Sequence, residues 1–149
     1  MNFDIKFDFQ RRDRLGLIEA IWGQDKSIDQ LERLCGNVLS KNEVVFITRI
    51  NSEKANYLLD LYDDARFYEE ANCLTIGKNF NKIITNKKVA IISGGSSDLA
   101  VTLEAQLALE IYGVNCQSFI DVGVAGLHRL MSQLEEINKY DVLIVCAGM

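Results

Sequence analysis

Hydrophobic positions along the chain recur at two spacings, one typical of strands and the other of helices. Runs of apolar and β-branched residues at 15–23 and 43–50 predict two strands, and alternation within 65–78 predicts an edge strand or hairpin. Between these runs, 27–41 and 51–64 carry apolar residues at helical spacing, which predicts two helices. The first half of the chain therefore alternates strands with helices.

Both predicted helices carry residues suited to their first turn and to their inner face. Ser27, with Gln30 three residues later, has the pattern of a capping box, and either Asn51 or Ser52 can cap the second helix. The residues expected to face inward are Ile28, Leu31, Leu34, Cys35 and Val38 in the first helix, and Ala55, Leu58, Leu59 and Tyr62 in the second.

A polar segment at 79–88 separates this half from the next and is the best candidate for a linker. Strands and helices that alternate call for right-handed crossovers and a parallel sheet. We therefore expect an α/β chain of two small parallel units, a domain at 1–80 and a second at 87–149. Within the second unit the pattern predicts a strand, a helix, a strand with a loop, a helix and a strand, at 87–95, 96–113, 114–126, 126–140 and 141–149.

Composition narrows the classes of partner and the expected location. The formal net charge of -5 argues against a duplex nucleic-acid partner, which usually meets a basic face. No apolar run approaches the roughly 18 residues that span a membrane, and the first residues lack the apolar stretch of a signal peptide. We therefore expect a cytoplasmic protein with no membrane partner.

The cysteines support the same location. Cys35, Cys73, Cys116 and Cys146 lie far apart among apolar residues, which predicts buried free thiols in a reducing compartment. No metal site is expected, because His128 is the only histidine and the spacing of zinc ligands is absent.

A run of small and polar residues, SGGSSD, follows the first strand of the second half. Gly94 and Gly95 would let the backbone approach a ligand, and Ser96 and Ser97 add hydroxyl groups at the positive end of a helix, which favours a phosphate. The alternative is that one of the serines only caps the helix, with Asp98 in its first turn. The run is neither a dinucleotide-binding fingerprint nor a P-loop, because it lacks the glycine spacing of one and the GK[ST] of the other.

A second loop of small residues, in DVGVAGLHRL, follows the next predicted strand. In a parallel sheet it would lie beside SGGSSD at the same edge, which would bring Asp121, Gly123, His128 and Arg129 toward the same ligand. His128 could act as a proton shuttle near neutral pH, and Arg129 could pair with a phosphate or carboxylate. The alternative for His128 is a surface or capping position.

A cluster of arginines precedes the strand predicted at 15–23. Arg11, Arg12 and Arg14 form either a solvated N-terminal arm or a group of cations that reaches a ligand phosphate or a neighbouring subunit.

Three strings in the second half, VAIISGGSSDLAV, DVGVAGLHRLM and DVLIVCAGM, resemble the LarB family. Its members are pyridinium-3,5-biscarboxylic acid mononucleotide synthases of nickel-pincer cofactor synthesis, formerly described as circadian phase modifiers or carboxylase-like proteins. In the first half, RRDRLGLIEAIWGQDKSIDQL and VVFITRINSEKANYLL are similar to the family's N-terminal region, so the resemblance covers nearly the whole chain. The family is related to the aminoimidazole ribonucleotide mutases and carboxylases, whose phosphate loop has a similar Gly-Ser-x-Ser-Asp pattern. The resemblance implies that the second unit is flavodoxin-like.

The resemblance also implies an activity and a site. LarB-type enzymes carboxylate the pyridinium ring of nicotinic acid adenine dinucleotide and cleave its phosphoanhydride, releasing AMP. Their co-substrate is CO2 or bicarbonate, Mg2+ is the candidate ion, no cofactor is covalently bound, and the related carboxylases are symmetric homo-oligomers. The site residues carried over are Gly94, Gly95, Ser96, Ser97 and Asp98 at the phosphate or ribose, with Asp121, Gly123, His128 and Arg129 beside them.

The sequence departs from the family at positions that affect catalysis. The family's nucleophilic cysteine and the acidic residue expected after the AGM string have no counterpart here, and Cys146 lies within a predicted strand. A serine also stands where the family has threonine in Gly-Thr-Ser-Asp. We therefore expect a truncated, inactive fragment that binds a nucleotide, with His128 as the one catalytic candidate.

Two alternatives to this function stay open. One is an aminoimidazole ribonucleotide mutase or carboxylase acting on a phosphoribosyl compound, which is disfavoured because Gly-Leu-His-Arg stands where that family has Ser-Ala-His-Arg. The other is a non-catalytic nucleotide-binding or regulatory module.

Overall fold

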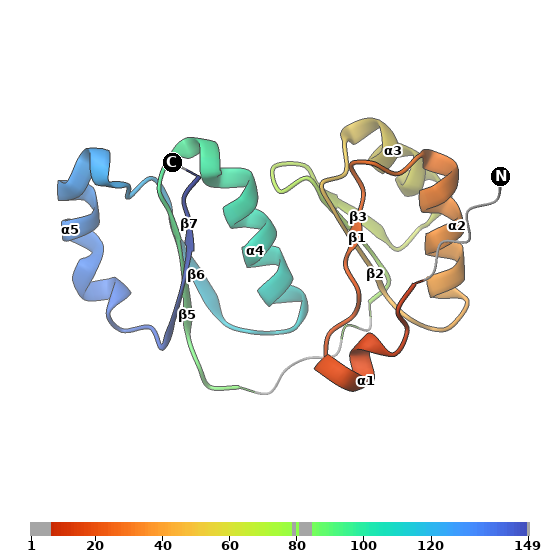
Figure 1. The fold of residues 1–149 in the computed structure, drawn as a ribbon, viewed down its shortest axis with the longest axis horizontal. Helices are drawn as coiled ribbons and strands as arrows, with labels where there is room; N and C mark the ends of the chain where they lie inside the picture. The colour runs from red at the N-terminus through yellow and green to blue at the C-terminus, as the bar shows by residue number, and fades with distance from the viewer. Residues whose placement is uncertain (1–6, 79, 81–84, 149) are drawn as a thin grey trace. The chain divides into compact units, whose positions relative to one another are not determined.

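The computed structural model describes residues 7–78, 80 and 85–148. The chain divides into two compact units, Met1–Asn79 and Phe80–Met149, and each is described by itself (Figure 1). Half of the segment expected to be a linker, at 79 and 81–84, lies outside the described residues. Among the described residues, no helix has both the length and the apolar character needed to cross a bilayer.

The first unit contains a mixed sheet in which the strands follow the order β1-β2-β4-β3. Strands β1 and β2 are parallel, as expected, whereas β2 and β4, and β4 and β3, are antiparallel. The hairpin expected within 65–78 is confirmed by β3 and β4, and the expectation of a parallel unit holds only for β1 and β2, because the short turn between β3 and β4 leaves no room for a crossover. The elements are α1 (Arg11–Leu15), β1 (Ile21–Trp22), α2 (Ile28–Leu39), β2 (Val45–Thr48), α3 (Ser52–Leu61), β3 (Ala65–Tyr68) and β4 (Cys73–Ile76).

Both long helices of the first unit begin at their predicted caps. The Ser27 hydroxyl accepts the amide of Gln30 and the Gln30 side chain accepts the amide of Ser27, which completes the capping box. Asn51, and not Ser52, caps α3, because its side chain accepts the amide of Lys54 at 3.0 Å. These local bonds satisfy amides that a helix start would otherwise leave unpaired.

The core of the first unit lies between α2, α3 and one face of the sheet. The inner face predicted for α3 is only partly right: Ala55 and Leu58 are buried, whereas Leu59 is exposed and Tyr62 is half-buried. The buried cluster consists of Ile21, Leu31, Leu34, Cys35, Val38, Val45, Ile47, Ile50, Ala55, Leu58, Leu74 and Ile76.

The segment before β1 differs from its prediction. The strand expected at 15–23 is limited to Ile21–Trp22, and Leu15 ends the short helix α1, which stops at Gly16 with a positive φ of 73°. The arginine cluster is therefore not a free arm. Arg12 pairs with Glu43 at 2.8 Å, and Arg14 pairs with Asp8 through two hydrogen bonds.

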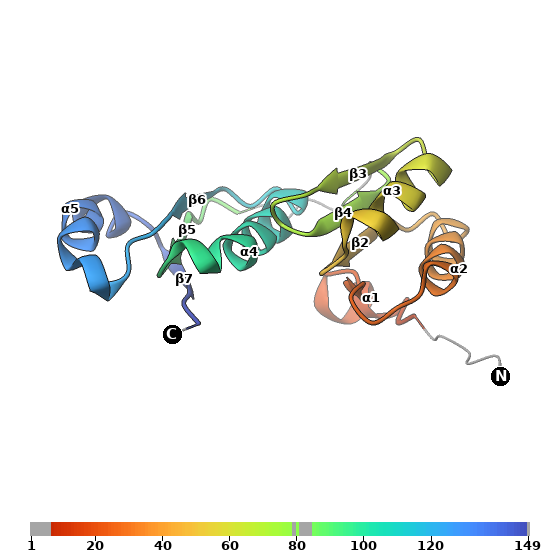
Figure 2. The same cartoon turned by 90° about the horizontal axis from the view of Figure 1, so that it is seen from above.

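The second unit is a parallel three-stranded sheet with the order β6-β5-β7. Helices α4 and α5 cover opposite faces of this sheet (Figures 1 and 2). In order of the chain, the strands follow the pattern 2-1-3, which is the first part of the flavodoxin-like order, so the expected fold class is confirmed. The elements are β5 (Val89–Ser93), the 3-10 turn η1 (Ser96–Asp98), α4 (Leu99–Ile111), β6 (Cys116–Phe119), the 3-10 turn η2 (Val124–Gly126), α5 (Leu127–Ile137) and β7 (Val142–Cys146).

Strand β7 is much less covered than β5, the central strand. Ala90 and Ile91 of β5 are fully buried, whereas Leu143 is 50% and Val145 64% exposed. Within the described residues, β7 pairs with β5 alone. Parallel strands are usually buried on both faces, so β7 presents an unusually apolar open edge.

Candidate functional site

A pocket of about 640 Å³ opens at the carboxyl end of the parallel sheet in the second unit. In doubly wound sheets this edge holds ligands, and the switch point lies beside the first strand, where the crossovers go in opposite directions. Strand β5 occupies that position here, with β6 and β7 on its two sides. The residues that line the pocket are Ile92, Gly94, Gly95, Ser97, Asp98, Val122, Gly123, Val124, Ala125, Leu130, Val145, Ala147 and Gly148.

The loops after β5 and β6 touch at two glycines. A Cβ atom added at Gly123 would lie 2.1 Å from the carbonyl oxygen of Gly94, so any side chain at this position would collide with the backbone. At Gly94, an added Cβ would lie 3.1 Å from the Cβ of Ala147, in the loop after β7. Glycine is therefore required where these loops approach one another.

Asp98 connects two of the loops through both oxygens of its carboxylate. Oδ2 accepts the amide of Gly95 at 2.9 Å, and Oδ1 accepts the amide of Gly148 at 3.1 Å. The Asp98 carboxylate is therefore engaged by the backbone, in addition to lining the pocket. Asp98 therefore holds the loops at the mouth of the pocket in place.

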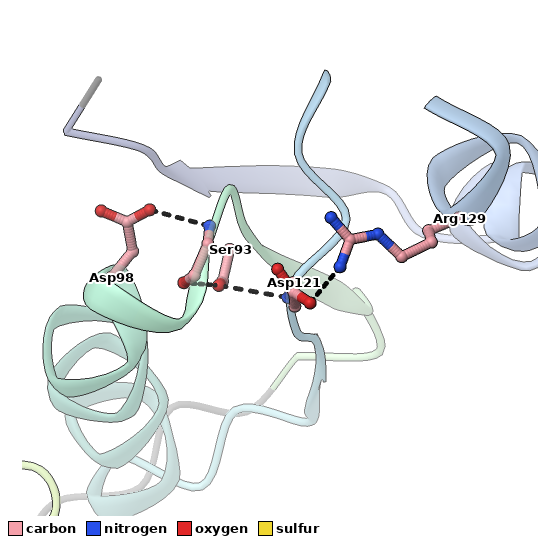
Figure 3. A network of polar contacts seen from close by, with 5 residues as sticks. Ser93, Asp98, Asp121 and Arg129 are labelled. Atoms are coloured by element: carbon pink, nitrogen blue, oxygen red, sulfur yellow. Dashed lines mark hydrogen bonds and ion pairs between the residues drawn. The ribbon is translucent and has the colours of Figure 1, made fainter. Parts of the chain in front are cut away.

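Buried Ser93 is a second connector, which the sequence did not single out as a site residue. Its hydroxyl donates to the carbonyl of Gly95 at 2.8 Å and accepts the amide of Asp121 at 3.4 Å (Figure 3). Ser93 thereby ties the loop after β5 to the loop after β6. The sequence feature that could have identified Ser93 is that it is the one polar residue of β5, at the end of an otherwise apolar strand.

The two serines that open the helix have different surroundings. Neither caps a helix, because Gly95 is the residue before η1 and Asp98 the residue before α4, and neither start has a side-chain cap hydrogen bond. Both serines are exposed, but Ser97 lines the pocket and Ser96 is not among the lining residues. The capping role considered for these serines is therefore not seen at either helix start.

Asp121 and Arg129 form an ion pair beside the pocket (Figure 3). Asp121 has a positive φ of 58°, and Arg129 packs so tightly against Gly126 that an added Cβ there would lie 2.4 Å from its Nε. Neither residue of the pair is among those that line the pocket, and exposed His128 is not among them either. The pair instead supports the loop that carries Gly123.

The pocket combines an apolar wall with backbone amides. Among the lining residues no side chain is basic, so an anion would be held by the Ser97 hydroxyl and by amides at the positive end of η1 and α4. A flat ring could pack on the apolar side chains. Those side chains are Ile92, Val122, Val124, Leu130 and Val145.

None of the four cysteines lines this pocket. None of the four is in a disulfide bond; Cys35, Cys73 and Cys146 are buried and Cys116 is half-buried. Burial raises the pKa of the Cys35 thiol to about 12, and burial followed by the nearby Glu110 raises that of Cys116. In the described part of the chain, no group of three or more histidine, cysteine or acidic side chains is placed to hold a metal ion.

Sequence comparison finds similarity to known proteins in both units. Residues 3–78 match the profile of the LarB/PurE-like N-terminal domain. An uncharacterized protein of Methanocaldococcus jannaschii is 33% identical over 153 residues, a match that covers 97% of this chain. The chain spans 59% of the length of that relative.

Proposed function

Because this chain belongs to the LarB/PurE-like family, we propose that its second unit forms part of the substrate site of a LarB-type enzyme. The proposed reaction is carboxylation of the pyridinium ring of nicotinic acid adenine dinucleotide, with cleavage of its phosphoanhydride and release of AMP. CO2 or bicarbonate is the proposed co-substrate, and Mg2+ is the proposed ion.

The observation that carries this proposal is the pocket at the carboxyl edge of β5, β6 and β7. It has an apolar side that suits a flat ring, and a helix start with the Ser97 hydroxyl that suits a phosphate. A nucleotide has both chemical characters in one molecule. The pocket volume of about 640 Å³ also falls in the range of small-molecule sites.

The residues take different parts in the proposed site. Ser97 meets the phosphate, because its hydroxyl is at the helix start and lines the pocket, whereas the Gly95 amide already donates to Asp98. Asp98 positions the loops, since its carboxylate binds two backbone amides. The ion pair of Asp121 and Arg129 holds the loop after β6.

The chemistry of carboxylation sets a further requirement. A pyridinium carbon is electron-poor, so a nucleophile must first add to the ring before a ring carbon can attack CO2; loss of the ring proton and of the nucleophile then restores the aromatic ring. The thiols of Cys35 and Cys116 are poorly suited to that role, because their raised pKa values keep them protonated, and none of the four cysteines lines the pocket. We therefore propose that this chain binds the dinucleotide without converting it.

Calorimetric titration tests the binding step. Nicotinic acid adenine dinucleotide should bind the chain, and Ser97→Ala should weaken binding by about fivefold to tenfold, the loss of one hydrogen bond. Ser96→Ala is the matched control, because Ser96 carries the same hydroxyl outside the pocket lining. No binding by the wild-type chain, or equal losses in the two variants, would contradict the proposal.

A non-catalytic nucleotide-binding module is the second candidate. It is favoured by one observation, which is that no cysteine lines the pocket. In a carboxylation assay with labelled bicarbonate, both candidates predict no incorporation of label by this chain, and incorporation would contradict both the non-catalytic module and the proposed lack of conversion. A phosphoribosyl compound serves as the competing ligand, and preferential binding of it would favour the aminoimidazole ribonucleotide branch of the family.

A further inference from the structure

Helix α5 carries two groups of apolar side chains, of which one packs on its own sheet. That group includes buried Ile137, which belongs to the core between α5 and strands β5 and β6. The other group is Leu127, Met131 and Leu134, which are 55%, 58% and 37% exposed. These three residues recur at the spacing of one helix face. Helix α5 therefore has an exposed apolar stripe, the α5 stripe, beside the face that is buried.

The α5 stripe lies on the side of the helix that is directed toward β7. One flank of α5 carries Gln133, which lines a small hollow together with Phe119 of β6. The opposite flank carries Leu130, which lines the large pocket together with Val145 of β7. Around the helix, the α5 stripe lies beyond Leu130 and away from Gln133, as their spacing along the helix requires. The stripe is therefore on the β7 side of α5.

The face of β7 on this side of the sheet is open. Leu143 lies beside Ala90 in the parallel register of β7 and β5. Two residues further along, Val145 lies beside Ile92. Because Ala90 and Ile92 pack in the core beneath α5, their partners in β7 point to the same side of the sheet. Leu143 is 50% and Val145 64% exposed, so with the α5 stripe they form one open apolar surface, the α5–β7 surface.

The connections of the sheet indicate which kind of element fits the α5–β7 surface. Right-handed crossovers place α4 on one face, where the chain passes from β5 to β6, and α5 on the other, where it returns past β5 to β7 (Figure 1). A further parallel strand at the open edge of β7 would continue in the direction of the second crossover. The helix before that strand would lie on the α5 side, directly over Leu143 and Val145. The surface therefore has the place of a helix that leads into a strand.

The comparison with the Methanocaldococcus jannaschii relative indicates where such a segment is found. The match covers 97% of this chain but 59% of the relative, so a substantial part of the relative has no counterpart here. A second copy of this chain fits the surface less well. Pairing of two β7 edges would cover the edges, but each α5 already lies on its own β5 and β6, so the Leu143 and Val145 side chains would stay open.

We propose that the α5–β7 surface binds a separate polypeptide segment, an amphipathic helix that leads into a strand, equivalent to the part of the relative outside the match. The apolar face of the helix covers Met131, Leu143 and Val145, and the strand pairs with the open edge of β7. Burial of these exposed side chains supplies the driving force, and the unpaired backbone groups of β7 fix the register of the strand. Binding of the segment does not depend on the nucleotide proposed for the pocket.

Coexpression tests the proposal without requiring that the segment folds by itself. The full chain is produced together with an affinity-tagged polypeptide that holds the unmatched part of the relative, and no nucleotide is added. The two should copurify as a one-to-one complex. In that complex the ε-methyl NMR signal of Met131 should shift from its position in the chain alone. The signal should also be protected from a soluble paramagnetic agent, because the methyl group is then buried.

Charged substitutions on the α5–β7 surface separate binding from folding. Met131→Glu and Leu143→Glu place a carboxylate where an apolar contact is proposed, so each should weaken the complex by about tenfold or more. The two side chains are 58% and 50% exposed, so the melting temperature of the chain alone should change little. Val101→Glu, at a 41% exposed valine of α4 on the opposite face of the sheet, is the matched control and should leave the complex intact.

Three results would overturn the proposal. They are the absence of copurification with the wild-type chain, a complex of unchanged strength in both Met131→Glu and Leu143→Glu, and a complex weakened as much by Val101→Glu. Dimers of the chain that Met131→Glu dissociates, without any binding of the segment, would assign the surface to a second copy and would also overturn it. The nucleotide proposal is tested separately, because its readout compares Ser97→Ala with Ser96→Ala and needs no segment.

Discussion

Asp98 accepts a hydrogen bond from the amide of Gly148 at 3.1 Å, although the two residues lie 50 positions apart in the chain. The other oxygen of the same carboxylate accepts the amide of Gly95 at 2.9 Å. One side chain at the start of α4 therefore joins the loops that follow β5 and β7. The shape of the pocket between these loops depends on this carboxylate.

Asp98→Asn should destabilise the second unit. An asparagine can accept only one of the two amides and would point an N–H group at the other, so we expect a loss of about 1.5 kcal/mol in the free energy of unfolding. Urea unfolding measures this loss, and Asp98→Ala, which accepts neither amide, should lose more. Two variants as stable as the wild type would show that the carboxylate does not hold the loops together.

Gly123→Ala should destabilise the second unit, because the added Cβ would lie 2.1 Å from the Gly94 carbonyl oxygen. The neighbour is backbone and cannot turn aside, so we expect a loss of about 2 kcal/mol or more in the free energy of unfolding. Gly95→Ala is the matched control, since its Cβ would meet only side-chain atoms at 3.7 and 3.8 Å. Thermal unfolding of both variants tests the close approach of the Gly123 and Gly94 backbones. Equal melting temperatures for the two variants would contradict it.

Asp141 should make the second unit sensitive to acid. Lys87 donates to its carboxylate at 2.9 Å, and this hydrogen bond, with that from the Lys88 amide, lowers the pKa of Asp141 below its usual value of 3.8. Because the folded pKa is depressed, the stabilisation is present at neutral pH and is lost as the pH falls through the folded pKa.

The corresponding measurement is the melting temperature as a function of pH. Asp141→Asn removes the titrating group, so its melting temperature should fall less than that of the wild type between pH 5 and about pH 2. Asp13→Asn, an exposed aspartate of α1, provides the control. Parallel curves for the wild type and Asp141→Asn would refute the assignment.

The open edge of β7 should promote self-association. Val145 is 64% exposed on a strand with no charged residue, which favours pairing with the edge of another molecule. Val145→Lys should reduce the association of the chain in light scattering, while Val101→Lys, at a 41% exposed valine on α4, should not. A wild-type chain that stays monomeric at high concentration would contradict both self-association through the edge of β7 and the homo-oligomer that the family resemblance implies.

Local patterns in the sequence were sufficient for much of the fold. The capping box of Ser27 and Gln30 is a relation between neighbours, so it could be read directly, and the apolar runs of β5 and β7 indicated strands, although only β5 is buried. The strand predicted at 15–23 is longer than β1, because Leu15 and Leu17 were counted as strand residues but are exposed. Hydrophobicity alone does not say whether a leucine is covered.

The details of the site depend on contacts between distant segments and could not be predicted. The Asp98 carboxylate looked like a first-turn acidic residue, and its bond to Gly148 exists only because β7 pairs beside β5. In the same way, the positive φ of Arg49 follows from bonds that anchor Thr48 and Ile50 to other loops. Sequence patterns located the loops, and the topology determined which of their atoms meet.

The most direct test of the nucleotide pocket is an NMR titration of the isotopically labelled chain with nicotinic acid adenine dinucleotide. The account predicts saturable shifts in the amide signals of Gly95, Ser97 and Gly123, which surround the pocket from the loops after β5 and β6. If these amides do not move while the dinucleotide is in excess, or if shifts are confined to the first unit, the pocket is not a nucleotide site.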